Sequence, residues 1–300
     1  MQYTQLGKTG RNVSKIGFGG ATAGLTNYLQ PFDPSDEKDR QGVVEAIREA
    51  LHLGVNYFDT AEGYGAGASE SIFAEGLTGI TPEEIFLATK TGPTKQENGR
   101  RIMRTEGEIR QSLEDSLRRL GRGSIDLIQI HGSYYSEETA RQILAKGGVL
   151  DTLEKARNEG LVKHIGFSIE TQNTALDLLV RSGQFDVMQV QYNLMFQHPY
   201  EACFKTGSLY DAKDAGLGTV IMRTLTSGLF QKWIQSVNPG NTFNYNPALL
   251  QYVLSNPLAD VALIGMRGIE QVRENAAVCD DLSGRINLTE LHKRYVERQE

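Results

Sequence analysis

The sequence predicts an α/β fold: a (β/α)8 TIM barrel that follows an N-terminal β-hairpin and forms a single domain over residues 1–300. Its short apolar runs are typical of strands buried on both faces, and helical patterns separate them. Strands separated by helices need right-handed crossovers and therefore pair in parallel. Eight such units close into a barrel. The eight expected strands are 14–19, 55–59, 85–90, 125–131, 164–168, 187–191, 218–222 and 261–264.

The N-terminal segment is expected to form the hairpin. Gly7-Lys8-Thr9 is similar to the end of a phosphate-binding loop, but Gln2 stands where that motif has its first glycine. We therefore interpret it as a turn. A doubly wound dinucleotide-binding sheet is also disfavoured, because residues 17–22 break the G-x-G-x-x-G pattern at its last position.

Helices are expected between the strands. Thr105 and Glu108 form a capping box, and the apolar stripe that follows them stops at Gly121. Further apolar stripes end in the same way at Gly54, Gly160 and Gly183. Residues 224–246 are rich in Gly, Asn, Ser and Thr and are expected to form a long loop. Loops of this length are often lids or clamps, and a disordered linker is the alternative.

Composition excludes several classes of protein. The chain is 39% hydrophobic and 23% charged, which is typical of a globular protein. Its net charge is −6 with scattered basic residues, so we expect no nucleic-acid partner. Apolar runs fall short of the roughly 18 residues that span a bilayer, and the N-terminus lacks a signal peptide's apolar region, so we expect a cytoplasmic protein without membrane contact. Cys203 and Cys279 are interpreted as reduced thiols, and no metal site is expected.

Polar side chains stand where the expected strands end, which is where chemistry gathers in this fold. They are Asp59, Lys90, His131 and Ser168, and the sixth strand carries Gln189 and Gln191. Tyr64 follows Asp59 in a glycine-rich loop that can bend over the barrel mouth. Taken singly, each has an ordinary explanation, such as a turn cap, a surface lysine or a loop aromatic.

The combination points to proton transfer. A buried Lys90 needs a carboxylate beside it, and Asp59 on the adjacent strand supplies one. A cation near a phenol lowers its pKa, so we expect Tyr64 to become a better proton donor to an alkoxide. His131 is expected to orient a substrate carbonyl. The sequence shows no nucleophile motif, so we expect a redox reaction. A proton donor reduces a carbonyl only if a hydride also reaches the carbonyl carbon, and a nicotinamide is the simplest hydride carrier.

These residues carry a family resemblance. Residues 58–65, Phe-Asp-Thr-Ala-Glu-Gly-Tyr-Gly, and the following Ser69-Glu70 resemble the signature of the aldo-keto reductases. The likeness continues in the family's order through 88–90, 125–131 and 165–168 to Glu274-Asn275 near the C-terminus. It implies a barrel that binds NADPH in extended form and a catalytic tetrad of Asp59, Tyr64, Lys90 and His131.

The resemblance also implies cofactor contacts, with Ser168 and Gln189 on the nicotinamide carboxamide and Asn275 on the adenine. Two departures stand out: Ile169 replaces a common Asn, and Arg223 follows Met222 where an aromatic ring often stacks on the nicotinamide. Arg267, with Gln271 nearby, is expected to hold the 2′-phosphate, which favours NADPH over NADH. The complete expected set is Gly20, Asp59, Ser168, Gln189, Met222, Arg223, Gly265, Arg267, Gln271 and Asn275.

The expected function is NADPH-dependent reduction of aldehydes or ketones to alcohols, with Tyr64 as the proton donor. Alternatives are an NAD(P)-dependent sugar dehydrogenase that runs the reverse reaction, a nucleotide-sensing subunit similar to potassium-channel β-subunits, and a non-redox lyase. The partner is then a small carbonyl compound or sugar. The sequence leaves the physiological substrate and the oligomeric state open.

Overall fold

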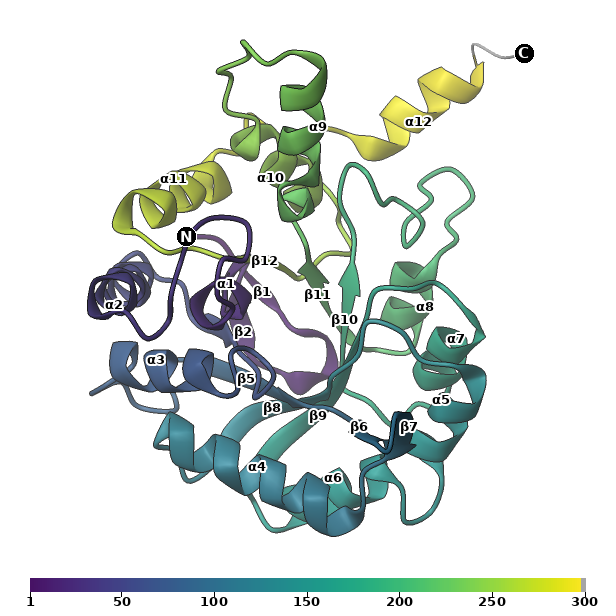
Figure 1. Cartoon of the computed structure of the whole chain (residues 1–300). Helices are drawn as coiled ribbons and strands as arrows, with labels where there is room; N and C mark the ends of the chain where they lie inside the picture. Colours follow the sequence, from purple (N-terminus) through teal and green to yellow (C-terminus); the bar gives the residue numbers. More distant parts are fainter. Residues whose placement is uncertain (298–300) are drawn as a thin grey trace.

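A closed barrel of eight parallel strands forms the centre of the computed structural model, which describes residues 1–297 (Figure 1). The strands are β3 (Ile16–Gly19), β4 (Tyr57–Asp59), β5 (Phe86–Thr91), β8 (Ile125–Ile130), β9 (Val162–Ile169), β10 (Val187–Gln191), β11 (Gly218–Met222) and β12 (Val261–Ile264). They follow one another around the barrel in chain order, and β12 closes it by pairing with β3. The predicted barrel is confirmed, and each expected strand overlaps an observed one.

The expected hairpin is confirmed as well. β1 (Tyr3–Gln5) pairs antiparallel with β2 (Asn12–Ser14), and the short 3-10 helix η1 (Gly7–Thr9) makes the turn. Leu6 and Val13 are fully buried and belong to the hydrophobic cluster inside the barrel. The hairpin therefore closes the end of the barrel where the strands begin.

Helices surround the barrel (Figure 1). They are α1 (Ala21–Gly24), α2 (Glu37–His52), α3 (Ala68–Gly76), α4 (Glu106–Leu120), α5 (Glu137–Leu144), α6 (Val149–Asn158), α7 (Thr174–Arg181), α8 (Ser208–Asp214), α9 (Leu229–Val237), α10 (Asn246–Leu254), α11 (Ile269–Asp280) and α12 (Leu288–Glu297). The capping box of Thr105 and Glu108 and the left-handed Gly121 bound α4 as predicted. The sequence over 288–300 also has a charged, helix-like pattern; α12 confirms the helix up to Glu297, and the last three residues lie outside the described part.

The segment 224–246 differs from its prediction as a loop. It contains the 3-10 helix η2 (Thr226–Gly228) and the helix α9. The residues of α9 are exposed or only partly buried. The apolar residues of this helix recur at helical spacing, so the sequence did contain a signal for it, which the surrounding Gly, Asn, Ser and Thr obscured.

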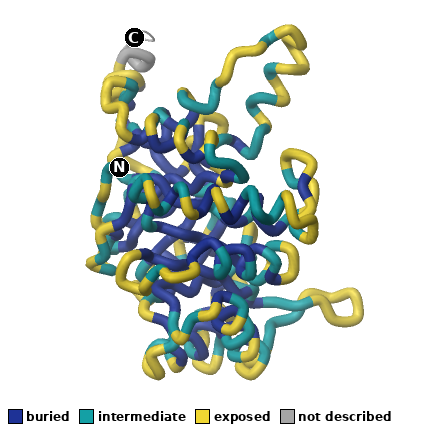
Figure 2. The backbone as a smooth tube through the Cα atoms, turned by 90° about the vertical axis from the view of Figure 1, so that its left-hand side faces the viewer, coloured by how far each residue is buried: buried dark blue, intermediate teal, exposed yellow. Residues whose placement is uncertain are grey.

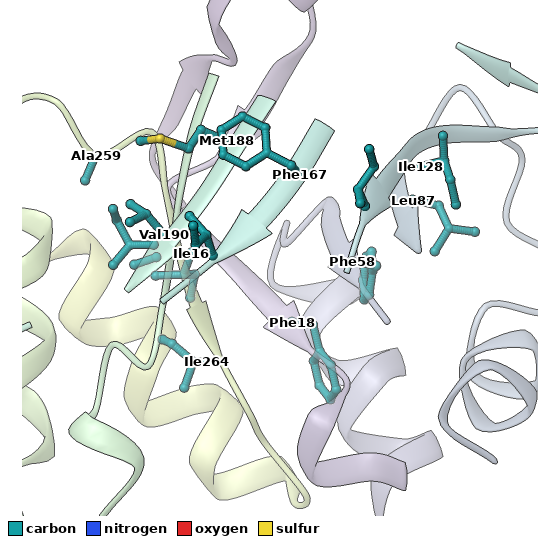
Figure 3. Close-up of a cluster of buried hydrophobic side chains, with 14 of the residues drawn as sticks. Ile16, Phe18, Phe58, Leu87, Ile128, Phe167, Met188, Val190, Ala259 and Ile264 are labelled. Carbon is teal, nitrogen blue, oxygen red and sulfur yellow. The ribbon is translucent and has the colours of Figure 1, made fainter. Parts of the chain in front are cut away.

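Side chains on the strands alternate between the barrel interior and the helical layer. The interior cluster takes one set of positions, including Tyr57, Phe86, Leu127 and Val187. The outward set packs against the helices, and Figure 3 shows part of it. In that cluster Phe18 on β3 stacks on Phe58 of β4, with their ring centroids 6.1 Å apart.

Two segments project from the end of the barrel where the strands finish (Figure 2). One is a two-stranded hairpin formed by β6 (Thr94–Glu97) and β7 (Arg100–Met103), and the other contains α9. Within residues 1–297, none of the helices is both long and apolar enough to cross a membrane.

Candidate active site

A cavity of about 1130 Å³ opens at the carboxyl ends of the strands. The predicted residues that line it are Gly20, Asp59, Tyr64, His131, Ser168, Gln189, Met222, Arg223 and Gly265. The wall also includes Tyr28 and the loop after His131, together with residues 101–103 of the β6–β7 hairpin. Most of the predicted site residues therefore meet around one cavity.

The strand alternation explains why these side chains meet. Asp59 stands two residues after the interior Tyr57, so it faces the same way at the mouth. Lys90 stands two residues after Ala88, another member of the interior cluster. The polar residues thus form the layer above the apolar core, where the strands end.

Asp59 and Lys90 form a buried ion pair, with 2% and 0% of their surfaces exposed. Lys90 Nζ donates to Asp59 Oδ1 and to the carbonyl of Thr60 at 2.9 Å. The other carboxylate oxygen accepts a hydrogen bond of 2.9 Å from Gln129 Nε2. The sequence analysis missed Gln129, although a glutamine in a buried strand, two residues before His131 and on the same face, was a usable signal.

Tyr64 and His131 complete the group. Lys90 Nζ lies 5.0 Å from the centroid of the Tyr64 ring. The Tyr64 and His131 rings meet edge to face, with centroids 5.4 Å apart and an interplanar angle of 87°. The structure therefore brings all four predicted catalytic residues together at one rim.

Burial and charge shift the pKa values of this group. Burial raises the pKa of Asp59, although Lys90 acts to lower it. Burial would lower the pKa of Lys90, but Asp59 and Tyr64 outweigh it and raise that pKa above its usual value. Burial, with help from the Lys90 charge, lowers the pKa of His131 to about 3, so its imidazole is neutral at pH 7.

The expected lowering of the Tyr64 pKa is wrong in its net direction. Burial raises the pKa of the phenol above its ordinary value, and Lys90 offsets only part of that shift. The ammonium acts as predicted, but the prediction left out the loss of hydration around the phenol. Tyr64 is therefore held protonated at neutral pH.

The next strands add polar groups beside this cluster. Ser168 Oγ lies 3.2 Å from both the backbone nitrogen and the carbonyl oxygen of Gly132. Gln189 Nε2 lies 3.9 Å from the sulfur of Met222. Gln189 is buried, and among the described residues its Oε1 has no hydrogen-bond partner. A buried acceptor at the edge of a cavity calls for a donor from a ligand.

Arg223 forms an ion pair with Glu170 across the end of β10, with Nη2 2.8 Å from Oε2. Both residues line the cavity. Arg223 has a left-handed backbone with φ of 57°, and its carbonyl accepts a hydrogen bond of 2.9 Å from Asn193 Nδ2.

Gly20 and Gly265 are required by close packing at the cavity floor. A Cβ on Gly20 would lie 2.5 Å from Ser69 Oγ, and one on Gly265 would lie 2.5 Å from Thr22 Cγ2. A larger residue at either position would therefore displace these packed neighbours.

Arg267, Gln271 and Asn275 lie beyond the cavity lining, at the start of α11 and along it. Arg267 donates to three backbone carbonyls of the segment 22–30 and stacks at 4.1 Å on the ring of Phe32. Gln271 accepts from the backbone of Arg267, and Asn275 donates to the carbonyl of Gln271, both at 2.8 Å. Arg267 thus anchors a loop, a contact that the sequence analysis did not foresee.

The β6–β7 hairpin was also missed. Asn98 and Gly99 connect its strands with φ values of 51° and 75°. Asn-Gly is a strong short-range sequence signal of a hairpin turn, so the sequence did contain a signal for this hairpin. The hairpin supplies one side of the cavity wall.

The fold is a parallel barrel with a cluster of buried ionisable side chains at the mouth of one cavity, and comparisons with known proteins identify its family. Residues 15–249 match the model of the aldo/keto reductase family. L-galactose dehydrogenase of Arabidopsis thaliana is 28% identical over 94% of this chain and 89% of its own length.

Solved structures share the fold. An aldo-keto reductase from Bacillus halodurans in its holo form superposes with a TM-score of 0.75 at 22% identity, covering 99% of this chain and 96% of that one. An aldo-keto reductase from Klebsiella pneumoniae in complex with NADPH gives a TM-score of 0.68 at 22% identity, with 97% and 93% covered.

This chain belongs to the aldo/keto reductase family. It is an NAD(P)H-dependent oxidoreductase that acts on small carbonyl compounds.

Proposed function

We propose that the chain acts as one barrel domain that reduces aldehydes or ketones with NADPH, and that Tyr64 donates the proton. The observation that carries this proposal is the buried Lys90 ammonium, which contacts Asp59 on one side and lies 5.0 Å from the Tyr64 ring on the other. A phenol beside a fixed cation is suited to give up its proton to a developing alkoxide.

Each of the four residues has a distinct part. Tyr64 transfers its proton to the substrate oxygen, and Lys90 stabilises the phenolate that remains. Asp59, held also by Gln129, keeps the ammonium charged and in place. His131 is neutral because its pKa is about 3, so it donates a hydrogen bond to the carbonyl without adding charge.

The residues present fit a nicotinamide cofactor. The buried Oε1 of Gln189 has no partner among the described residues, and the amide group of a carboxamide would supply the missing donor. Ser168, Met222, Gly20 and Gly265 line the cavity beside it. When bound, the nicotinamide supplies the hydride that the side chains of this site cannot provide. The NADPH complex of the Klebsiella relative supports the choice of cofactor.

At the other end of the cofactor, we assign the 2′-phosphate to Arg267 and Gln271 and the adenine to Asn275. A guanidinium carries more N–H donors than the three carbonyl contacts of Arg267 use, so it can hold the loop and a phosphate together. We assign Arg223 to the cofactor as well, through its place at the rim beside Met222.

Oxidation of a sugar is the second candidate, because the same groups serve the reverse reaction. The cavity wall offers hydroxyl-binding side chains, including Ser133, Ser136 and Gln142, and one relative is an L-galactose dehydrogenase. A purely nucleotide-sensing role is less well supported, because the assembled tetrad is equipped for turnover.

The experiment is to incubate the purified protein with NADPH and, separately, with NADP⁺ against aldehydes, ketones, sugars and alcohols while following nicotinamide absorbance. We expect NADPH oxidation with aldehydes or ketones. NADP⁺ reduction with sugars alone would favour the second candidate, and no turnover in either direction would refute both.

A further inference from the structure

Glu62 is a carboxylate that the chemistry above does not use, although it lies two residues before Tyr64. Its Oε1 accepts from Arg104 Nη1 at 2.6 Å and from the backbone nitrogen of Gly92 at 3.3 Å. Its Oε2 accepts from Ser112 Oγ at 2.6 Å. Hydrogen bonds to a charged group are stronger than those between neutral groups, so these three contacts hold Glu62 firmly.

The donors belong to three separate elements around the site. Gly92 follows β5, the strand that carries Lys90, and Ser112 lies on α4. Arg104 follows β7, and its backbone nitrogen donates to Pro93 at 2.9 Å to close the base of the hairpin. A single carboxylate therefore joins the Tyr64 loop to β5, to α4 and to the β6–β7 hairpin.

The Tyr64 loop needs such an anchor. Gly65, Ala66 and Gly67 have left-handed φ values of 67°, 51° and 92°. Glycine-rich backbone loses much conformational freedom when it is ordered, so contacts from outside the loop must hold it. Glu62 supplies these contacts from a partly buried position, with 19% of its side chain exposed.

The hairpin touches the space that a substrate would fill. Arg101, Ile102 and Met103 line the cavity together with residues of the loop after His131. The ion pair of Arg104 and Glu62 thus connects the wall of the cavity with the loop that carries the phenol.

We propose that Glu62 is a positioning residue for Tyr64, and that Arg104 couples it to the β6–β7 hairpin so that the cavity wall and the proton donor are held in one arrangement. This inference rests on the proposed function, because it takes Tyr64 as the proton donor. It means that turnover depends on Glu62 and Arg104 as well as on the four catalytic residues.

The first test is Glu62→Gln, which keeps the shape of the side chain and removes the charge that pairs with Arg104. We expect kcat to fall about tenfold, since small displacements of a reacting group are costly, while the Kd for NADPH stays within about twofold. Hydrogen exchange should become faster in 60–67 and 92–104. Glu114→Gln is the matched control, because Glu114 pairs with Arg110 on the outer surface of α4 at 2.7 Å.

The second test asks whether Glu62 acts through Tyr64. In a Tyr64→Phe background, Glu62→Gln should cause no further loss of turnover, and Arg104→Met should reproduce the effects of Glu62→Gln without adding to them. A merely structural role would lower the melting temperature and leave kcat per folded molecule unchanged, and that outcome would overturn the proposal. An additional tenfold loss in the Tyr64→Phe background would overturn it as well.

The outcomes separate this inference from the proposed function. If Tyr64→Phe abolishes turnover while Glu62→Gln and Arg104→Met keep wild-type kcat, the positioning role fails and the proton donor stands. If Tyr64→Phe keeps full turnover, the proton donor fails, and the positioning role fails with it. Should Glu62→Gln not fold, Arg104→Met tests the same contact from the other side.

Discussion

Removing the Lys90 ammonium should destabilise the protein strongly. In Lys90→Met the buried Asp59 carboxylate loses its ion-pair partner and keeps the Gln129 amide as a donor. Breaking a buried ion pair from one side costs about 3–5 kcal/mol. A chain of 300 residues unfolds with an entropy of about 0.6 kcal/mol/K, so the melting temperature should fall by about 5–8 °C.

A double-mutant cycle followed by calorimetry isolates the interaction. Asp59→Asn combined with Lys90→Met removes both charges, so the double variant should be more stable than Lys90→Met alone. The coupling free energy should be about 2 kcal/mol or more. As a control, Arg141→Met breaks an exposed pair with Glu137 and should cost less than about 1 kcal/mol. Stability of Lys90→Met within about 1 kcal/mol of wild type, or strict additivity in the cycle, would refute the reasoning.

Further predictions concern pH and cofactor choice. Because His131 takes up a proton near pH 6.5 when unfolded but only near pH 3 when folded, acid should destabilise the wild type relative to His131→Gln by about 1 kcal/mol per pH unit between pH 6 and 4. A difference in unfolding free energy that does not change with pH would contradict this. The kcat of carbonyl reduction should be flat from about pH 6 to 9, since burial keeps Tyr64 protonated and His131 neutral. A step near pH 6.5 in that profile would contradict the assignment of a neutral His131. Arg267→Ala should weaken NADPH binding about tenfold and NADH binding less, measured by fluorescence titration, because only NADPH carries the 2′-phosphate. Equal losses for the two cofactors would show that Arg267 serves only to hold the segment 22–30.

The sequence predicted the barrel because eight short apolar runs alternate with helical patterns, and several of these runs end at a polar residue. Asp59, Lys90 and His131 could be placed together for the same reason, since residues at the ends of neighbouring parallel strands must meet. The alternation of side chains along each strand places these residues on the interior face, and this alternation can be read from the sequence.

Other features depend on contacts that no local pattern encodes. The three carbonyls that engage Arg267 come from a segment more than 200 residues earlier in the chain. The pKa of Tyr64 depends on how completely its neighbours exclude water, which the order of residues does not specify. The helix α9 is a different case: its apolar residues do recur at helical spacing, but the loop-like composition around it led to the prediction of a loop.

The central claim is that Tyr64 donates the proton, and single-turnover kinetics test it directly. Tyr64→Phe loaded with NADPH is mixed rapidly with an aldehyde that the wild type reduces, and the loss of nicotinamide absorbance is followed. We expect the Kd for NADPH to stay within a few-fold of wild type and the rate of NADPH oxidation to fall by a factor on the order of 100 or more. Oxidation at close to the wild-type rate would show that another group supplies the proton.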